Sequence, residues 1–281
     1  MPKSKSFFEG RKAVLLTKHG KEEAIKDLFE GETGCEIVVY SCFDTDSLGT
    51  FTRDIPRYGS QLETVRRKAM IGMDLTGIDI GLASEGSFGP HPVIPFLPGN
   101  VELIIFIDKR EGIEIVGECV SERTNFAETI VGNIEEAEVF AHKAGFPSHF
   151  LIVNCEHGGA ETMIKGVNTW EKLRREIELI LKSGNKVSLE TDMRAFANPT
   201  RMLAIKKAAE DLVQKIKSTC PKCSLPGFWV KEKKRGLPCE CCGAPTHLVM
   251  SEVYICDGCS FTQETKIASR ASAQFCDYCN P

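Results

Sequence analysis

Four Cys-x-x-Cys pairs lie in the last 62 residues and provide the strongest chemical signal of the sequence. The pairs are Cys220/Cys223, Cys239/Cys242, Cys256/Cys259 and Cys276/Cys279. A Cys-x-x-Cys turn places two sulfur atoms on one side of a tight loop, and two such turns provide the four thiolates that structural zinc prefers. The four pairs therefore predict two structural Zn²⁺ sites, each held by four cysteines.

A disulfide framework is the main alternative for so many cysteines, and an iron–sulfur cluster is another. Disulfides belong to oxidising compartments, whereas the N-terminal segment MPKSKSFFEGRKAVLL is too charged for a signal peptide. No stretch of the sequence approaches the roughly 18 apolar residues of a membrane span. Four evenly distributed pairs also suit two separate tetrahedral zinc sites better than a cluster. We therefore expect a cytoplasmic protein without a membrane partner.

The spacing of the pairs suggests which of them share a zinc ion. The second and third pairs flank the segment THLVMSEVYI, which suits a hairpin, and this assignment leaves the first pair with the fourth. Pairing in sequence order is the alternative. Cys241 lies inside the second pair and is a spare thiol in either arrangement.

The segment ASEGSFGPHP, residues 83–92, is the second candidate site. It follows a predicted strand, and α/β proteins commonly bind ligands where strands end. We expect a loop here, in which Gly86 lets a ligand approach the backbone closely. The side chains that could serve such a pocket are Ser84, Glu85, Ser87 and His91. The alternative is a tight Gly/Pro loop whose glutamate faces water.

The turn after the first predicted strand reads Thr17-Lys18-His19-Gly20-Lys21. Backbone amides at a helix N-terminus bind anions. Thr17, His19 and Lys21 therefore form a candidate phosphate-binding turn. A solvated basic turn explains the same residues equally well.

Two other predicted helices begin near charged candidates. Arg194 and Arg201 flank the start of the last helix, and guanidinium groups suit phosphate or carboxylate ligands. The alternative there is a capped helix with surface salt bridges. Glu63 and Lys68 lie on the helix that starts after Ser60, where Glu63 could reach the edge of the sheet. Because Ser60-x-x-Glu63 is also a capping box, Glu63 has a purely structural alternative role.

The apolar pattern predicts alternating strands and helices up to residue 218. The expected strands are residues 12–16, 35–40, 77–83, 101–107, 113–118, 150–154 and 186–190. The expected helices are residues 21–29, 60–75, 133–144, 170–183 and 199–218. This alternation favours an α/β fold, a three-layer domain with a mixed sheet. We expect a ligand-binding or catalytic α/β domain over residues 1–218 and a zinc-ribbon-like domain over residues 219–281.

The charge balance argues against a protein built to hold nucleic acid. The net charge is −4 at pH 7. The tail carries seven Lys/Arg against six Asp/Glu, and only residues 231–235 form a basic cluster. Nonspecific nucleic-acid binding depends on neutralising many phosphates. Nucleic acid is therefore a weakly supported partner. The candidate turn at residues 17–21 favours a small phosphate-containing molecule instead, and the oligomeric state stays open.

Several motifs together resemble a family of microbial proteins that join an α/β domain to a zinc-ribbon-like tail. The motifs are GTFT, ASEGSFGPHP, TDMRAxxNPTRM, CPxCxxPGF, LPCxCCGxPT and CxxCNP. The resemblance covers residues 12–281 and implies this two-part architecture, but it implies no activity.

Residues 12–120 also resemble the inosine/xanthosine triphosphate pyrophosphatases. Those enzymes open with a strand and a Thr/Ser-x-Asn-x-x-Lys phosphate loop, and this chain has KAVLL and then TKHGK, with His19 in place of the asparagine. They continue with Glu-x4-Lys-Ala on a helix, which Glu63, Lys68 and Ala69 match. They then have an acidic metal ligand after a strand, where this chain has Glu85 alone.

This resemblance implies a Mg²⁺-dependent nucleoside triphosphate phosphohydrolase or pyrophosphatase. Glu63 and Glu85 would hold Mg²⁺, while Lys21 and Lys68 would contact phosphates, with Arg201 as an additional contact. The catalytic candidates are Glu63, Glu85, Lys68 and His91.

The alternative function is a binding module without catalysis. Its zinc ribbons would contact nucleic acid or protein through residues 231–235 and an exposed Trp229 or Phe228, and its α/β domain would sense a small ligand.

Overall fold

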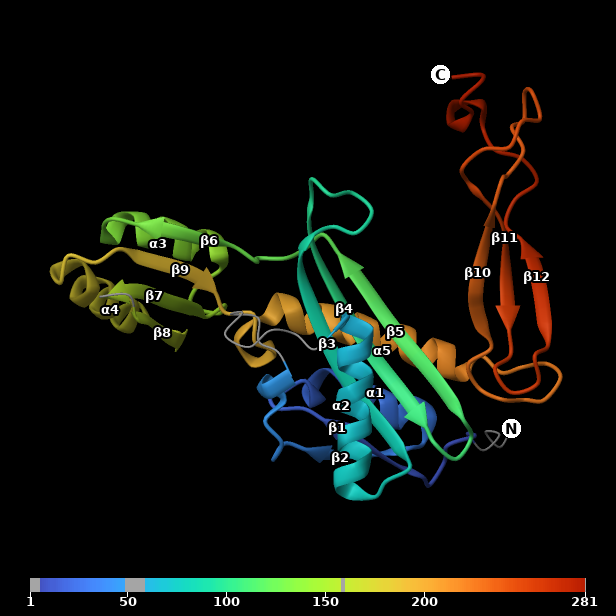
Figure 1. The fold of residues 1–281 in the computed structure, drawn as a ribbon, viewed down its shortest axis with the longest axis horizontal. Coiled ribbons are helices and arrows are strands. Elements are labelled where there is room, and N and C mark those ends of the chain that lie inside the picture. Colours follow the sequence, from blue (N-terminus) through green and yellow to red (C-terminus); the bar gives the residue numbers. More distant parts are fainter. Residues whose placement is uncertain (1–5, 49–58, 158–159, 281) are drawn as a thin grey trace.

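The computed structural model describes residues 6–48, 59–157 and 160–280. Three β-sheets follow one another along these residues, and each forms a separate part of the molecule (Figure 1). Three short 3-10 helices complete the described elements: η1 (Thr45–Leu48), η2 (Ala195–Ala197) and η3 (Ala273–Phe275).

The first sheet contains five strands in the order β2-β1-β3-β4-β5. The strands are β1 (Lys12–Leu16), β2 (Glu36–Tyr40), β3 (Ile80–Pro90), β4 (Pro98–Asp108) and β5 (Ile113–Ser121). β1 pairs in parallel with β2 and β3, whereas β3, β4 and β5 pair antiparallel. The sheet is therefore mixed, as the sequence predicts.

Helices cover both faces of the first sheet. Helices α1 (Glu22–Thr33) and α5 (Pro199–Lys217) share a buried core with Leu15 of β1. Helix α2 (Gln61–Thr76) shares a second core with Val14, the preceding residue of the same strand. Successive strand residues point to opposite faces of a sheet. The predicted three-layer α/β architecture is thus confirmed.

Local sequence signals place two helix starts where they were expected. The Ser60 hydroxyl accepts from the Glu63 backbone N–H at 3.2 Å, and the Glu63 carboxylate accepts from the Ser60 N–H at 2.7 Å, which completes the capping box. The Asn198 side chain caps α5, and Pro199 occupies the first helical position.

The strand β3 corrects the loop that was predicted after residue 83. β3 continues to Pro90, and residues 84–90 pair with residues 98–104 of β4. Gly86 is required here because the Arg201 guanidinium and the Glu102 carboxylate pass close to its backbone. A Cβ at position 86 would lie 2.5 Å from Arg201 Nη2 and from Glu102 Oε1. Gly86 therefore marks close packing within a strand and not a turn.

A second, antiparallel sheet lies in the part of the chain between β5 and α5, which we call the inserted unit (residues 128–191). Its strand order is β6-β9-β7-β8. The strands are β6 (Glu128–Val131), β7 (Leu151–His157), β8 (Ala160–Val167) and β9 (Val187–Thr191). Helices α3 (Ile134–Ala144) and α4 (Trp170–Lys182) pack on this sheet and share a core of their own with it.

The sequence did not predict β6 and β8, and it assigned residues 1–218 to one three-layer domain. Both strands lie at the edges of the second sheet. β6 has only four residues, ETIV, and β8 contains Lys165 and Gly166, so neither shows a clear apolar alternation.

The tail contains the third sheet, with the antiparallel order β10-β11-β12. Its strands are β10 (Trp229–Arg235), β11 (Val249–Ile255) and β12 (Thr262–Lys266). The tail follows α5 directly, and Leu225 packs against the α1/α5 core, so the base of the tail is docked on the first sheet's layers (Figure 1). No helix among the described residues is long and apolar enough to cross a membrane.

Candidate functional site

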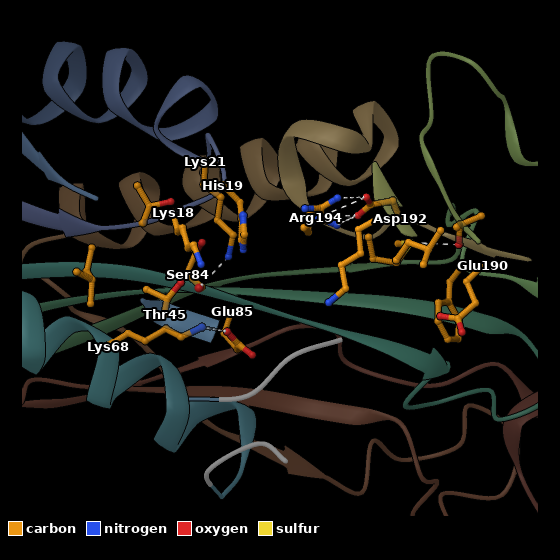
Figure 2. Close-up of a pocket in the computed structure, with 17 residues that line it drawn as sticks. Lys18, His19, Lys21, Thr45, Lys68, Ser84, Glu85, Glu190, Asp192 and Arg194 are labelled. Carbon is orange, nitrogen blue, oxygen red and sulfur yellow. Dashed lines mark hydrogen bonds and ion pairs between the residues drawn. The ribbon is translucent and has the colours of Figure 1, made fainter. Parts of the chain in front are cut away.

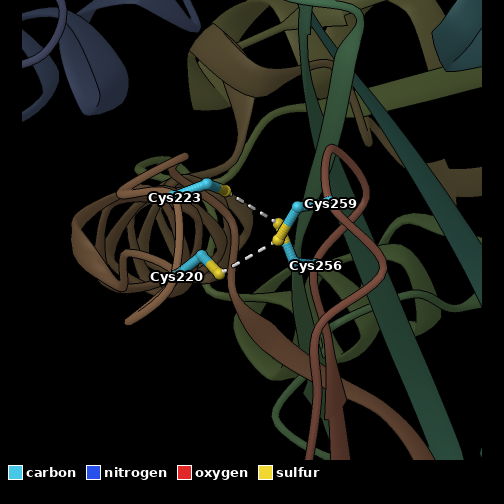
Figure 3. Close-up of side chains that lie close together, drawn as sticks. All are labelled: Cys220, Cys223, Cys256 and Cys259. Carbon is cyan, nitrogen blue, oxygen red and sulfur yellow. Dashed lines mark hydrogen bonds between the residues drawn. The ribbon is translucent and has the colours of Figure 1, made fainter.

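The eight Cys-x-x-Cys sulfurs form two tetrads at opposite ends of the third sheet. One tetrad contains Cys220, Cys223, Cys256 and Cys259, and the other contains Cys239, Cys242, Cys276 and Cys279. The sulfur atoms of each tetrad lie within 4.8 Å of one another. Figure 3 shows the first tetrad, where two Sγ–Sγ distances are 3.7 and 3.5 Å. Zn–S bonds of 2.3 Å in a tetrahedron require ~3.8 Å between sulfurs, so either tetrad could hold a metal ion with the geometry of structural zinc.

The tetrads correct the predicted pairing of the Cys-x-x-Cys turns. The first turn shares a tetrad with the third, and the second with the fourth, so both pairings drawn from the sequence are wrong. The strands supply the reason. β10 carries the chain from the first turn to the second, antiparallel β11 returns it to the third, and β12 leads back toward the fourth. Seven strand residues span about 23 Å, so neighbouring turns stand at opposite ends of the sheet. Cys241 is exposed and belongs to neither tetrad.

The basic cluster of the tail is matched by carboxylates. Lys231 pairs with Asp257 at 2.9 Å, and Lys234 pairs with Glu264 at 2.6 Å. Phe228, a predicted contact residue, is instead buried in a small core beside the first tetrad. These contacts reduce the charge and the aromatic surface that the tail could offer to nucleic acid.

A cleft lies where β1 ends, between the first sheet and the inserted unit (Figure 2). The helices that follow β1 and β2 cover opposite faces of the sheet. The space beyond the carboxyl end of β1, where its parallel pairing with β3 stops, is therefore a topological switch point, where open α/β sheets bind ligands. Leu16 pairs with Ala83 across these parallel strands. The next residues are Thr17, which follows β1, and Ser84, which belongs to β3, and both line the cleft.

The hydroxyl groups of Thr17 and Ser84 are buried and unsatisfied. Each residue is 4% exposed, and neither hydroxyl has a hydrogen-bond partner among the described residues. Burying a hydroxyl without a partner costs free energy. Two such groups on one wall of a cleft indicate a polar ligand or ordered water at this position.

Two buried lysines accompany these hydroxyls. The Lys21 ammonium donates to the Ser84 backbone carbonyl at 3.0 Å, and Lys68 pairs with Glu85 at 2.6 Å (Figure 2). Burial, reinforced by the neighbouring positive charges of Arg201 and Lys68, lowers the pKa of Lys21 from 10.5 to about 7. Lys21 therefore loses its proton readily in the unliganded cleft, and an anion bound beside it would favour the charged form.

The opposite wall comes from the inserted unit and the segments that join it to the first sheet. Its lining residues are Phe126, Ile152, Lys165, Glu190, Thr191, Asp192, Met193 and Arg194. Arg194 Nε donates to both oxygens of the fully buried Asp192 carboxylate, at 2.9 and 3.1 Å. Sequence reasoning missed Phe126, Lys165 and Glu190, because no motif marks them. Lys165 of β8 and Glu190 of β9 reach the cleft only through the second sheet, and Phe126 lies in the segment just before β6.

The structure thus brings one group of predicted site residues together. Those that line the cleft are Thr17, His19, Lys21, Lys68, Ser84, Glu85 and Arg194. They come from the turn after β1, the middle of β3, the segment after β9 and one face of α2.

Five other predicted residues do not line the cleft. Glu63 is occupied by the capping box, and the Ser60 hydrogen bonds lower the pKa of its exposed carboxyl. The His91 ring accepts from the Val93 and Ile94 amides at 3.2 and 3.1 Å and so stabilises the β3–β4 turn. Gly86 and Ser87 belong to β3, which pairs with β4 there.

Arg201, the fifth, is fully buried and has protein partners on several sides. Its Nε donates to Glu102 at 2.8 Å, and its Nη1 donates to the Met193 carbonyl. Met193 lines the cleft, so Arg201 supports the cleft wall from behind.

Comparison with protein families supplies one match. Residues 68–281 match the profile of a family described as a domain of unknown function (DUF6671), and no curated protein matches the chain. The matched range makes up most of the chain. It includes Lys68, Ser84, Glu85, the inserted unit and both cysteine tetrads. The chain therefore belongs to the DUF6671 family.

Proposed function

We propose that the cleft binds a small phosphate-containing molecule, with a nucleotide as the ligand class. The observation that carries this proposal is the pair of buried, unpartnered hydroxyls of Thr17 and Ser84, beside the amines of Lys21 and Lys68. Hydroxyl and ammonium groups are donors, and phosphate oxygens accept from them strongly.

The charge of the lining supports the same ligand class. Five basic side chains line the cleft, namely Lys18, Lys21, Lys68, Lys165 and Arg194. Three carboxylates oppose them, namely Glu85, Glu190 and Asp192. A partly buried cleft with excess positive charge favours an anion because screening by water is weak there.

The more specific form of the proposal is hydrolysis of a nucleoside triphosphate. Lys68 and Glu85 form a buried ion pair on the cleft wall. A ligand phosphate would draw the Lys68 ammonium away and leave the Glu85 carboxylate as a base. A water oxygen then attacks the phosphorus, its proton passes to Glu85, and the P–O bond to the leaving phosphate breaks.

A resident Mg²⁺ site at Glu63 and Glu85 does not fit the described residues. Glu63 is exposed and engaged in the capping box, and Glu85 is paired with Lys68. Within the described part of the chain, the cysteine tetrads are the only groups of three or more metal-ligating side chains with converging ligand atoms. In this proposal Mg²⁺ would enter the cleft bound to the nucleotide substrate.

A nucleotide panel tests the proposal. Wild-type protein, Glu85→Gln and Lys21→Met would be assayed with Mg²⁺ for release of phosphate and pyrophosphate, and for nucleotide affinity. We expect Glu85→Gln to abolish turnover while keeping affinity, and Lys21→Met to weaken affinity. Lys26→Met, on the exposed side of α1, is the matched control. Binding without turnover would leave a nucleotide-binding protein, and absence of both would overturn the proposal.

A further inference from the structure

We propose that the inserted unit side of the cleft holds a second subsite, in which Phe126 stacks on the flat heteroaromatic ring of the ligand. This inference rests on the proposed function, because it assigns the ring end of the molecule whose phosphates lie at Thr17 and Ser84. Phe126 lines the cleft although 40% of its surface is exposed to solvent. An aromatic ring on the wall of a polar cleft is a surface on which a nucleobase can stack.

The ring of Phe126 is held from behind. It stacks on Phe88 with a centroid distance of 6.0 Å and an interplanar angle of 28°. Phe88 in turn lies against the Arg201 guanidinium, whose Cζ is 5.2 Å from the ring centroid. Arg201 is fixed by the buried Glu102. This layered support places Phe126 before a ligand arrives, and a preorganised contact loses less free energy on binding.

The backbone around Phe126 is fixed as well. The Phe126 N–H donates to the Thr124 hydroxyl at 3.1 Å, and the next N–H, of Ala127, donates to the Thr191 hydroxyl at 3.1 Å. Thr191 itself lines the cleft at the end of β9. The segment that carries Phe126 is therefore tied to the strand that forms the same wall.

A carboxylate on this wall suggests how the ring would be recognised at its edge. Glu190 lines the cleft, and the Asn154 side-chain amide donates to Glu190 Oε1 at 2.6 Å, which orients the carboxylate. A carboxylate accepts hydrogen bonds and donates none. The subsite therefore favours a base such as guanine, which presents adjacent N–H donors at its edge.

The experiment compares a whole nucleotide with its phosphate part. Affinities for GTP and for inorganic tripolyphosphate would be measured by calorimetry with wild type, Phe126→Ala and Phe126→Leu. The leucine variant keeps apolar packing on Phe88 and removes only the aromatic face, so it serves if the alanine variant fails to fold. Phe7→Ala is the matched control, because Phe7 is 45% exposed, contacts one aromatic neighbour and lies outside the cleft.

We expect both Phe126 variants to weaken GTP binding about 5- to 150-fold, since a stacked base contributes ~1–3 kcal/mol. Tripolyphosphate affinity should not change, and Phe7→Ala should bind both ligands like wild type. If the Phe126 variants bind GTP like wild type, or lose both ligands equally, the stacking subsite is wrong while the phosphate site stands. If wild type binds neither ligand, the subsite and the proposed function both fail.

Discussion

Cys223 Sγ lies 3.5 Å from Cys256 Sγ, although 33 residues separate them in the sequence. Between them the chain runs out along β10, passes through the second Cys-x-x-Cys turn and returns along β11. The two cysteine tetrads are therefore interleaved, and each strand of the tail connects one tetrad to the other. Neither tetrad can form completely before the third sheet has brought together the two Cys-x-x-Cys turns of that tetrad.

Zinc content of double variants tests this interleaved arrangement. Cys223→Ser with Cys256→Ser damages one tetrad only, and we expect one zinc ion per chain to remain. Cys223→Ser with Cys239→Ser damages both tetrads, and we expect the loss of both ions. Cys241→Ser should keep both, because Cys241 belongs to neither tetrad. Atomic emission measurements on the folded proteins decide the matter, and the opposite result for the two double variants would refute the interleaving.

Removal of zinc should unfold the tail and leave the rest of the chain folded. Metal binding supplies most of the folding free energy of such small units, whereas the first sheet and the inserted unit have cores of their own. The two tryptophans separate these parts, because Trp229 starts β10 and Trp170 starts α4. In a Trp170→Phe background a chelator should shift the Trp229 fluorescence. In a Trp229→Phe background it should not shift that of Trp170, and an unchanged Trp229 signal would contradict the prediction.

Lys21 should make the stability of the α/β part depend on pH. Its pKa falls from 10.5 to about 7 on folding, so the unfolded chain binds more protons between these values. The cost of burying the charge is complete below pH 7 and is relieved as the pH rises toward 10.5. Between these pH values the free energy of unfolding rises by up to ~1.4 kcal/mol per pH unit.

Urea unfolding at pH 6, 7.5 and 9 measures this effect. Lys21→Met should exceed wild type in stability most at pH 6, and its advantage should shrink toward pH 9. Lys26→Met, with an exposed side chain, should follow the pH dependence of wild type. If the free energies of unfolding of Lys21→Met and wild type differ by the same amount at all three pH values, Lys21 stays charged in the fold.

Arg201 should contribute to stability and not to ligand contact. Arg201 and Glu102 are both fully buried and lie 2.8 Å apart. Arg201→Met leaves the Glu102 charge without its partner, which costs about 3–5 kcal/mol, and Glu102→Gln in addition should restore much of the loss. Denaturant unfolding measures both. If Arg201→Met is as stable as wild type but no longer binds nucleotide, Arg201 contacts the ligand instead.

The sequence predicted the local features of the fold well. The capping box at Ser60, the Asn198-Pro199 helix start and the apolar strand VELIIFI depend on neighbouring residues, and each lies where it was expected. The loop prediction for Ser84–Pro90 was wrong because Gly86 allows a close contact with Arg201, which is distant in sequence. No local pattern can show such a contact.

The candidate site was predictable on one wall only. Thr17, Lys21 and Ser84 follow or belong to strands of the parallel part of the first sheet, so a general rule for α/β folds points to them. Lys165 and Glu190 come from a second sheet whose edge strands carry weak patterns, and Phe126 lies in the segment just before that sheet. The pairing of the cysteine turns likewise required the strand order of the tail, because spacing alone permits several pairings.

Calorimetric titration of inorganic tripolyphosphate into wild type, Lys21→Met and Lys26→Met tests the central claim most directly. It measures binding to the phosphate site at Thr17, Ser84 and Lys21, and it depends neither on turnover nor on recognition of a nucleobase. We predict binding to wild type and to Lys26→Met with equal affinity, and roughly 10- to 100-fold weaker binding to Lys21→Met, as for the loss of a charge-assisted hydrogen bond. Equal affinity for all three proteins, or no binding to wild type, would contradict the account.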